Sequence, residues 1–177
     1  GLAASLASTL EHEHAGDSLA VGEQLRRYAT VDWLTGVING SKLRAVIDHQ
    51  WARPLRDRVS TYLVRVKLCD LNAVNHRYGR TIGDLLLKDI AACLQASAKT
   101  SDIVGRLSGA GFGAMLVGCS TEEGASYFCK ALSSRLGEQL GRRDLAVDVI
   151  AGVASLGQAD SAEAALAAAE QQTFKVA

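Results

Sequence analysis

The 177-residue chain is poor in several features that mark particular classes of protein. It contains one proline and no low-complexity tract, which argues against long disordered segments. Its 19 basic and 19 acidic residues cancel, which argues against a general nucleic-acid binder, because such proteins carry a basic excess. No run approaches the roughly 20 apolar residues that span a bilayer, so we expect no membrane insertion.

The use of cysteine points to a reducing environment. The four cysteines form no Cys-x-x-Cys pair, and three of them lie in apolar runs, where reduced cysteines pack as small hydrophobic residues. We therefore expect a cytoplasmic location, either for the chain itself or for the cytoplasmic part of a larger sensor protein.

Hydrophobic residues make up 48% of the chain, and the length suits one domain with a substantial core. Their periodicity predicts helices and strands that alternate along the chain. The expected helices cover residues 2–29, 41–51, 81–98, 122–140 and 161–174. The expected strands cover residues 59–71, 103–107, 112–117 and 147–154. Strands mixed with helices, and one hairpin among them, predict an α+β or α/β sheet layered with helices.

The segment RLSGAGFGAML, residues 106–116, carries a glycine-rich turn between two expected strands. A dinucleotide-binding loop needs Gly-x-Gly-x-x-Gly at the start of a helix, whereas here the third glycine comes one residue early and a strand follows. The Gly-Lys-Ser/Thr of a P-loop and the Gly-x-Ser-x-Gly of a nucleophile elbow are absent. The simplest interpretation is a hairpin turn in which glycine supplies positive φ angles.

Four further segments accompany this turn: DWLTGVING at residues 32–40, VKLCDLNAVNHRYGRTIGDLLL at 66–87, DVIAGVA at 148–154 and AAAEQQTFKVA at 167–177. In order and spacing, the five segments resemble the motifs of the GGDEF domain family. In chain order those motifs are D-x-L-T-G-L-x-N-R, D-I-D-x-F-K-x-I-N-D-x-x-G-H-x-x-G-D-x-L, R-Y-G-G-D/E-E-F, T-x-S-x-G-V-A and A-D-x-A-L-Y-x-A-K. The resemblance covers residues 30–177.

The resemblance implies an α+β fold, an α/β sandwich of the nucleotidyl-cyclase type with a central mixed, largely antiparallel sheet flanked by helices. It divides the chain into a leading linker or signalling helix, residues 1–30, and a degenerate GGDEF domain, residues 31–177. Active members of the family condense two GTP molecules into cyclic di-GMP, with one GTP held by each subunit of a dimer. In those members two acids hold two divalent metal ions, and a signature acid helps to activate the 3′-hydroxyl.

The signature of this chain departs from the family at its acids. Its five positions are, in order, Ser108, Gly109, Ala110, Gly111 and Phe112. Ala110 falls on the metal-binding acid and Gly111 on the Glu that follows, while Lys67 falls on the first Asp of D-I-D. An ammonium group and two neutral residues cannot chelate Mg²⁺, which binds oxygen ligands, so we expect no metal site, no cofactor and no catalysis. The closing lysine of the family, which helps to hold phosphate, falls on Ala177.

The residues that hold guanine in the family are retained as Asn75 and Asp84. A carboxylate that accepts two N–H groups beside an amide suits guanine. Lys67 is placed to pair with a nucleotide phosphate without Mg²⁺, and Gly109 to line the same site. The alternatives are structural: Asp84 caps its helix together with Thr81, Asn75 caps or turns the preceding loop, and Lys67 is a solvated lysine at a strand end.

The segment KTSD, residues 99–102, falls at the product-binding inhibitory motif R-x-x-D of the family. Asp102 matches, whereas Lys99 replaces the arginine, which keeps the charge but loses the planar fork that grips guanine and phosphate together. Arg106 matches the signature arginine and is expected to contribute to this site. Alternatively, Lys99 is only a cation at the C-terminus of a helix, where it interacts favourably with the helix dipole.

Three functions stay open at this point. The leading hypothesis is a catalytically inactive GGDEF domain, which acts as a regulatory or interaction module in cyclic di-GMP signalling. It would work with a fused or separate output domain, such as an EAL phosphodiesterase, and dimerise through the leading helix. The alternative is a receptor that binds GTP through Asn75 and Asp84, or cyclic di-GMP through the Lys99–Asp102 region. A residual diguanylate cyclase is the third hypothesis.

Overall fold

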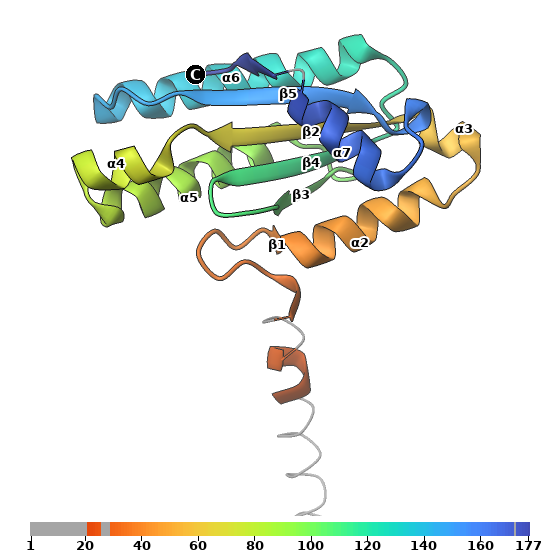
Figure 1. Ribbon diagram of the computed structural model, residues 1–177, viewed down its shortest axis with the longest axis horizontal. Coiled ribbons are helices and arrows are strands. Elements are labelled where there is room, and N and C mark those ends of the chain that lie inside the picture. Colours follow the sequence, from red (N-terminus) through yellow and green to blue (C-terminus); the bar gives the residue numbers. More distant parts are fainter. Residues whose placement is uncertain (1–20, 26–28, 172) are drawn as a thin grey trace, which may run out of the picture.

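The computed structural model describes residues 21–25, 29–171 and 173–177. The leading helix expected over residues 2–29, and with it the linker over residues 1–30, lies mostly outside this description. Residues 21–25 are helical and lie below the sheet and its helices (Figure 1). None of the helices described combines the length and the apolar character that a membrane span requires.

Six strands form one sheet in the order β1-β3-β4-β2-β5-β6 (Figure 1). β1 and β3 are parallel, and all other neighbouring strands are antiparallel. The strands are β1 (Ile38–Asn39), β2 (Thr61–Leu68), β3 (Ile103–Arg106), β4 (Gly111–Val117), β5 (Val149–Ser155) and β6 (Thr173–Lys175). This mixed, largely antiparallel sheet flanked by helices confirms the predicted α+β fold.

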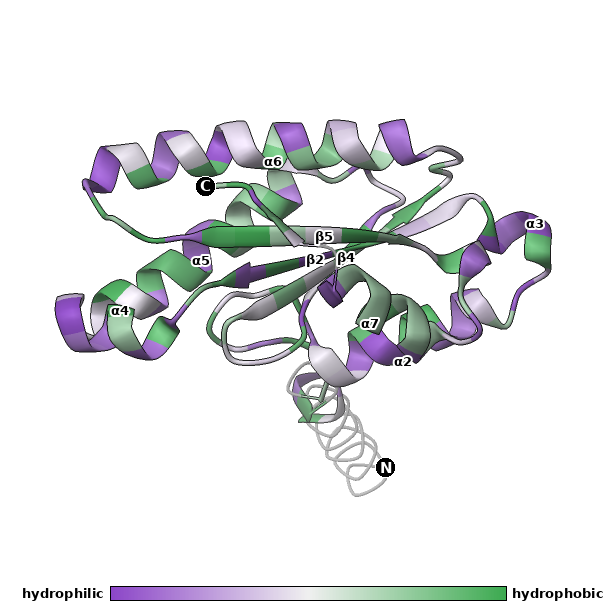
Figure 2. Ribbon diagram, turned by 45° about the horizontal axis from the view of Figure 1, so that its top comes forward, coloured by the Kyte–Doolittle hydropathy of each residue, from purple (hydrophilic) through white to green (hydrophobic). Residues whose placement is uncertain are grey.

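Helices pack on both faces of the sheet. They are α2 (Gly40–Trp51), α3 (Leu55–Arg58), α4 (Leu71–Tyr78), α5 (Arg80–Ser97), α6 (Glu122–Arg143) and α7 (Ala162–Gln171), with a 3₁₀ turn η1 (Leu156–Gln158) after β5. Figure 2 shows α6 on one side of the sheet and α2 and α7 on the other. This arrangement leaves the loops at the two ends of the strands accessible.

The alternation of side chains along β2 divides the core into two clusters. Val64 and Val66 are buried on the face that α5 and α6 cover. Leu63 points to the opposite face, where it packs in one cluster with Leu43 of α2 and Leu166 of α7. Each fully buried aliphatic side chain contributes about 1.5–3 kcal/mol to folding. Because side chains alternate along a strand, residues two apart on β2 share a face, and Arg65 and Lys67 lie on the same side as Leu63.

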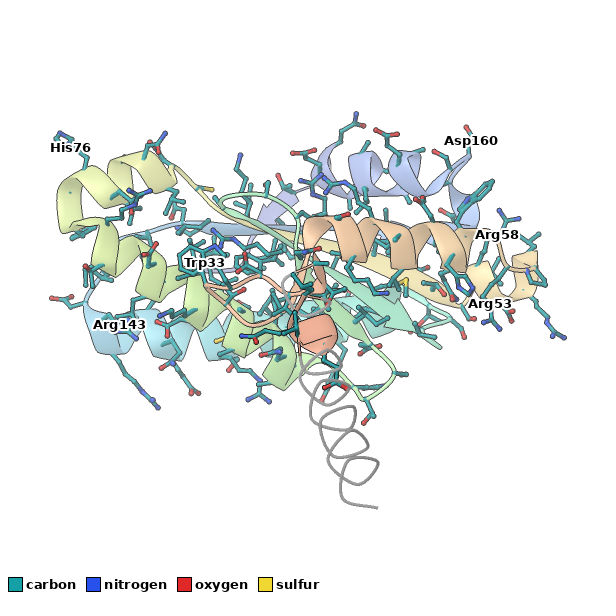
Figure 3. All side chains as sticks on the ribbon, turned by 90° about the horizontal axis from the view of Figure 1, so that it is seen from below. Trp33, Arg53, Arg58, His76, Arg143 and Asp160 are labelled. Atoms are coloured by element: carbon teal, nitrogen blue, oxygen red, sulfur yellow. The ribbon has the colours of Figure 1, made fainter. Side chains whose placement is uncertain are left out.

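An ion pair joins the two long helices of the first face. Arg143, near the end of α6 (Figure 3), donates to both carboxylate oxygens of Asp89 on α5, at 2.6 and 3.1 Å. Asp89 is one of the few buried polar residues described, at 8% exposure. The hydrogen bond to Asp89 raises the pKa of the Arg143 guanidinium. The pair fixes the end of α6 against α5.

The segment after β2 differs from the expectation. Residues 71–78, which the sequence assigns to a strand end and a loop, form α4. Asp70 adopts the left-handed conformation, with φ of 49°, and its carboxylate accepts a hydrogen bond from the amide of Ala73 at 3.3 Å. Gly79, with φ of 89°, separates α4 from α5, and α5 starts at Arg80 without a side-chain cap. The predicted cap by Thr81 and Asp84 is therefore wrong, because the conformational freedom of Gly79 starts the helix one residue earlier.

The C-terminal segment also differs from the expectation. The helix expected over residues 161–174 ends at Gln171, and Thr173–Lys175 forms β6 antiparallel to β5. The three residues of β6 are exposed, so no alternating burial marked them as a strand in the sequence. This strand places the end of the chain along β5.

Candidate functional site

The glycine-rich turn connects β3 to β4 and is closed by its own backbone. The amides of Leu107 and Ser108 donate to the carbonyl of Gly111 at 2.8 and 3.2 Å, and the amide of Gly111 donates to the carbonyl of Ser108 at 3.3 Å. Residues 108–111 all have negative φ. The expectation that glycine supplies positive φ here is therefore wrong, and the turn closes with ordinary backbone angles.

Arg106 holds this turn from the strand that precedes it. Its Nε and one terminal nitrogen donate to the carbonyl of Gly109, at 3.2 and 2.7 Å. The other terminal nitrogen donates to both carboxylate oxygens of Asp32, each at 3.2 Å. The side chains of Arg106 and Asp32 are only 14% and 15% exposed. The signature arginine thus serves the shape of the turn.

Asp32 is the centre of a second turn, at the start of the domain. Its carboxylate accepts hydrogen bonds from the amide and the hydroxyl of Thr35, at 2.9 and 2.6 Å. Partial burial works to raise the pKa of Asp32, but the hydrogen bonds from Thr35 and from Arg106 outweigh it and hold that pKa below its ordinary value. Asp32 is therefore an anion that joins the opening motif to the glycine-rich turn.

Asn39 ties the same region to the segment before the domain. Its Nδ2 donates to the carbonyl of Ala29 at 3.0 Å, and its Oδ1 accepts from the amide of Lys42 at 2.9 Å and so caps α2. Residue 29 is helical. Asn39 also pairs with Arg106 in the register of β1 with β3, so the residue that contacts Ala29 lies beside the residue that holds the glycine-rich turn.

The structure brings Lys67, Ala110 and Gly111 together, as the motif positions predict. Lys67 lies opposite Gly111 in the pairing of β2 with β4, and the next amide, that of Leu68, donates to the carbonyl of Ala110 at 3.0 Å. Lys67 and Ser108 are exposed, whereas Phe112 is fully buried in the core. An ammonium group, a methyl group and a glycine supply no oxygen ligand from their side chains, so this set does not fit the Mg²⁺ ions that the family uses.

The part of the chain that the structure describes contains no group of three or more His, Cys, Asp or Glu side chains that could hold a metal ion. Lys67 instead shares a small hollow of about 170 Å³ with four other residues, Arg65, Ile150, Glu170 and Thr173. Arg65 donates to Glu170 at 2.9 Å across this hollow.

The sequence did not single out Arg65, Glu170 or Thr173. The available signal was the position of Arg65, two residues before Lys67 on the same strand. Ala177, to which the closing motif assigned the phosphate-holding position, does not line the hollow. It instead pairs with the backbone of Val149.

The two residues expected to hold guanine lie on consecutive helices, Asn75 on α4 and Asp84 on α5. The Oδ1 atom of Asn75 is buried and has no hydrogen-bond partner among the described residues. It lies against Gly83, where an added Cβ would come within 1.8 Å of it. Asp84 is half-buried, and none of the hydrogen bonds described involves its carboxylate. Neither residue caps its helix, so the capping alternatives are wrong.

The segment that resembles the inhibitory motif forms a tight turn before β3. The carboxylate of Asp102 accepts from the amide of Lys99 at 2.8 Å and from the amide of Val117 at 3.1 Å. The side chain of Lys99 is exposed. Because Arg106 is engaged with Asp32 and Gly109, two of the three candidate residues already have partners within the chain.

The mixed sheet, the arginine-held turn between β3 and β4, and the helix pair after β2 define an α+β domain of the diguanylate-cyclase type. The chain belongs to the GGDEF domain family: the family described as "Diguanylate cyclase, GGDEF domain" matches residues 29–176.

Similar proteins agree with this assignment. Protein y4lL of Sinorhizobium fredii is 30% identical in an alignment of 150 positions that covers 81% of this chain and 18% of that protein. The probable diguanylate cyclase DgcE of Escherichia coli is 29% identical in an alignment of 140 positions that covers 72% of this chain and 12% of DgcE. The chain thus spans less than one fifth of the length of these two relatives.

Solved structures with the same fold include domains in complex with cyclic di-GMP. The coiled coil and GGDEF domain of DgcB from Caulobacter crescentus, in complex with cyclic di-GMP, has a TM-score of 0.74 and 26% identity, over 96% of this chain and 91% of that one. The S helix–GGDEF–EAL structure of LapD from Vibrio cholerae, bound to cyclic di-GMP, has a TM-score of 0.70 over 88% of this chain and 36% of that one. At 16% identity, LapD shares the fold alone.

Proposed function

We propose that this chain is a catalytically inactive GGDEF domain that acts as a regulatory or interaction module in cyclic di-GMP signalling. The observation that carries the proposal is the set of residues at the turn. Lys67 lies opposite Gly111, beside Ala110, where the family has its acids. Without carboxylates at these three positions, we expect no Mg²⁺ to be held there to neutralise phosphate charge, and none of the three side chains can activate a hydroxyl. We therefore expect no cofactor, no Mg²⁺ site and no turnover.

The contacts around Arg106 support a regulatory role. Arg106 joins the turn at Gly109 to Asp32, and Asn39 joins the same region to Ala29. A shift of the helical segment at Ala29 would thus reach the turn through Asn39 and its strand partner Arg106. We propose that the leading helix supplies that shift, from the cytoplasmic side of a sensor or through a homodimer. The partner would be a fused or separate output domain, such as an EAL phosphodiesterase.

A turnover assay tests the catalytic half of this proposal. The purified chain is incubated with GTP and Mg²⁺ or Mn²⁺, and the products are separated by chromatography and identified by mass spectrometry. An active diguanylate cyclase serves as the positive control. We expect unchanged GTP from this chain. Formation of cyclic di-GMP above the level of a no-protein control would overturn the proposal.

A pair of variants tests the regulatory half. Arg106→Ala loosens the turn, whereas Ala110→Ser changes the turn surface and leaves its anchor intact. In cells that express the protein, we expect Arg106→Ala to change the cellular level of cyclic di-GMP and Ala110→Ser to leave it unaltered. Equal effects of the two variants, or no effect of either, would argue against a role of the anchored turn in signalling.

A second candidate function, a guanine-nucleotide receptor, is favoured by one observation. The buried Oδ1 of Asn75 has no hydrogen-bond partner among the described residues and lies against Gly83, the residue before Asp84, whose carboxylate also makes none of the hydrogen bonds described. Such a pair could be satisfied by the N–H groups of guanine. Calorimetric titration with GTP and with ATP, each with and without Mg²⁺, tests it. Preference for GTP that disappears in Asp84→Asn supports a receptor; equal heats for GTP and ATP exclude guanine recognition.

A further inference from the structure

We propose that the free edge of β5 at Val153–Ser155 is a docking site for an extended segment of a partner protein. The segment adds to the sheet as a further strand and carries a lysine or an arginine. The inference rests on the proposed role as an interaction module, and it names the surface and the kind of partner.

β5 has a strand on both sides for only part of its length. Its pairing with β2 extends to Ser155, whereas its described pairing with β6 covers Ile150, Ala151 and Gly152. Among the described residues, no other strand lies on the β6 side of β5. The last three residues of β5 are therefore an edge of the sheet, and such an edge is a template for an added strand.

The backbone groups of β5 alternate in direction. The amide of Cys69 donates to the carbonyl of Asp148, so in this register the even-numbered residues of β5 point their backbone groups toward β2. The odd-numbered residues point away from β2, as Val149 does where it pairs with the end of the chain. Val153 and Ser155 continue this series past the last pair with β6. They present the backbone groups with which an added strand would pair.

A hollow of about 410 Å³ lies beside this edge. On its α7 side it is lined by Ala164 and Ala168, which are one helical turn apart and are not buried. Their methyl groups leave room between the helix and the edge of the sheet. Because side chains alternate along a strand, a docked segment would place those of one face in this hollow while its backbone pairs with β5.

The charges around the hollow have one sign. Its charged lining residues are Glu122, at the start of α6, and Asp160, shortly before α7. Neither carboxylate makes an ion pair within the part of the chain that the structure describes. α6 and α7 lie on opposite sides of the sheet (Figure 2), so the two acids flank the edge of β5. This charge pattern is complementary to a basic segment.

The edge is remote from the glycine-rich turn. Ser155 pairs with Tyr62 near the start of β2, whereas the turn lies at the other end of that strand, opposite Lys67. Figure 3 shows Asp160 and His76 of α4, the helix that follows β2, at opposite ends of the domain. A partner docked at this edge would therefore leave the turn accessible.

Peptide selection tests the site on the whole chain. A phage-displayed library of short random peptides is selected on the purified protein, and the enriched peptides are synthesised and titrated into the isotope-labelled chain. We expect saturable chemical-shift changes at Val153–Ser155, and a lysine or an arginine in the enriched sequences. Of the two sets of alternate backbone nitrogens in a peptide, methylation of one should abolish binding and methylation of the other should preserve it. Only one set faces β5 when the peptide pairs as a strand.

Ser155 supplies a variant that removes one backbone donor. Its φ of −77° suits proline, so Ser155→Pro removes the outward N–H and keeps the backbone path. We expect the enriched peptides to bind about fivefold more weakly to this variant. The double variant Glu122→Gln/Asp160→Asn should weaken them by a similar factor. Glu163→Gln, which is exposed on α7 and does not line the hollow, is the matched control and should have no effect.

Thermal unfolding of each variant checks that the fold is kept. A selection without enrichment would overturn the proposal, as would enriched peptides that contact another surface, lack basic residues or tolerate both methylations. Self-association of the chain that Ser155→Pro abolishes would assign the edge to a second copy and would also overturn it. If no peptide binds but Arg106→Ala still changes cellular cyclic di-GMP, this surface fails and the proposed function stands; peptide binding with a silent Arg106→Ala gives the reverse.

Discussion

Two arginines on nearby strands, Arg106 on β3 and Arg65 on β2, each pair with a carboxylate, and their surroundings differ. Arg106 and Asp32 are 14% and 15% exposed, and each makes further hydrogen bonds, to Gly109 and to Thr35. Arg65 and Glu170 are 21% and 59% exposed, and Glu170 has only this partner among the described residues. The first pair is part of a connected network, whereas the second can open without disturbing its neighbours.

The same contrast runs through the signature itself. Phe112 is fully buried, and Gly109 offers the carbonyl that Arg106 holds. Ala110 and Gly111, which stand at positions of family acids, only complete the backbone of the turn. Arg106, Gly109 and Phe112, which match the family motif, shape the turn, whereas neither position of a family acid carries an acid.

The largest effect is expected from the buried part of the signature. Phe112→Ala should lower the free energy of unfolding by about 3–5 kcal/mol, because it removes a fully buried aromatic side chain and leaves a cavity. Ala110→Ser should change it by less than about 0.5 kcal/mol. Urea denaturation at pH 7 measures both. A similar loss of unfolding free energy in the two variants would mean that Ala110 supports the fold as strongly as the buried Phe112 does.

The anchor of the turn comes next. Arg106→Ala should cost about 2–3 kcal/mol, because it leaves the largely buried Asp32 without its cation and the Gly109 carbonyl without its donors. Lys99→Ala, at an exposed side chain in the turn before β3, is the control and should stay within about 0.5 kcal/mol of the unsubstituted protein. Equal stability of Arg106→Ala and Lys99→Ala would show that the anchor is dispensable.

A smaller effect depends on pH. The pKa of Asp32 is lower in the folded chain than its ordinary value of about 3.9. Its contribution to stability is therefore complete above the unfolded pKa and is lost as the pH falls through the folded pKa. Asp32→Asn should cost about 1 kcal/mol at pH 7, and the difference from the unsubstituted protein should shrink between roughly pH 5 and pH 2. Chemical denaturation across that range gives the difference; a constant gap would contradict the pKa assignment.

The smallest effect is expected at the exposed pair. Glu170→Gln should change the free energy of unfolding by less than about 0.5 kcal/mol, because an ion pair with one partner mostly in solvent contributes little. The same urea titration measures it beside Arg106→Ala. A loss as large as that of Arg106→Ala would mean that the hollow is a structural element and not a replaceable contact.

The sequence predicted the central elements well because their burial follows a clear period. β2 and β4 alternate or are continuously apolar, and α5 has a regular apolar stripe. α4 was missed because it is short and buries one residue, Val74, so it has almost no periodic signal. β6 was missed because its residues are exposed and its partner, β5, is distant in sequence.

The candidate site was predicted only where motif order sufficed. The motif positions brought Lys67, Ala110 and Gly111 together, and the structure places them so. Two features needed the fold. The role of Arg106 depends on its ion pair with Asp32, which is 74 residues away. The hollow depends on the contact of Glu170 on α7 with Arg65 on β2, which is 105 residues earlier. Such contacts are set by sheet register and helix packing, which a linear pattern does not specify.

The central claim is that the chain keeps the GGDEF fold but lacks the acids that hold Mg²⁺ in the family. A measurement of Mg²⁺ binding tests this claim most directly. Isothermal titration calorimetry would compare the unsubstituted protein with the double variant Lys67→Asp/Ala110→Glu, with thermal unfolding to confirm that both are folded. We predict no saturable Mg²⁺ binding by the unsubstituted protein and saturable binding by the double variant, whose carboxylates supply the missing oxygen ligands. Mg²⁺ binding of similar strength by the unsubstituted protein, or none by a folded double variant, would contradict it.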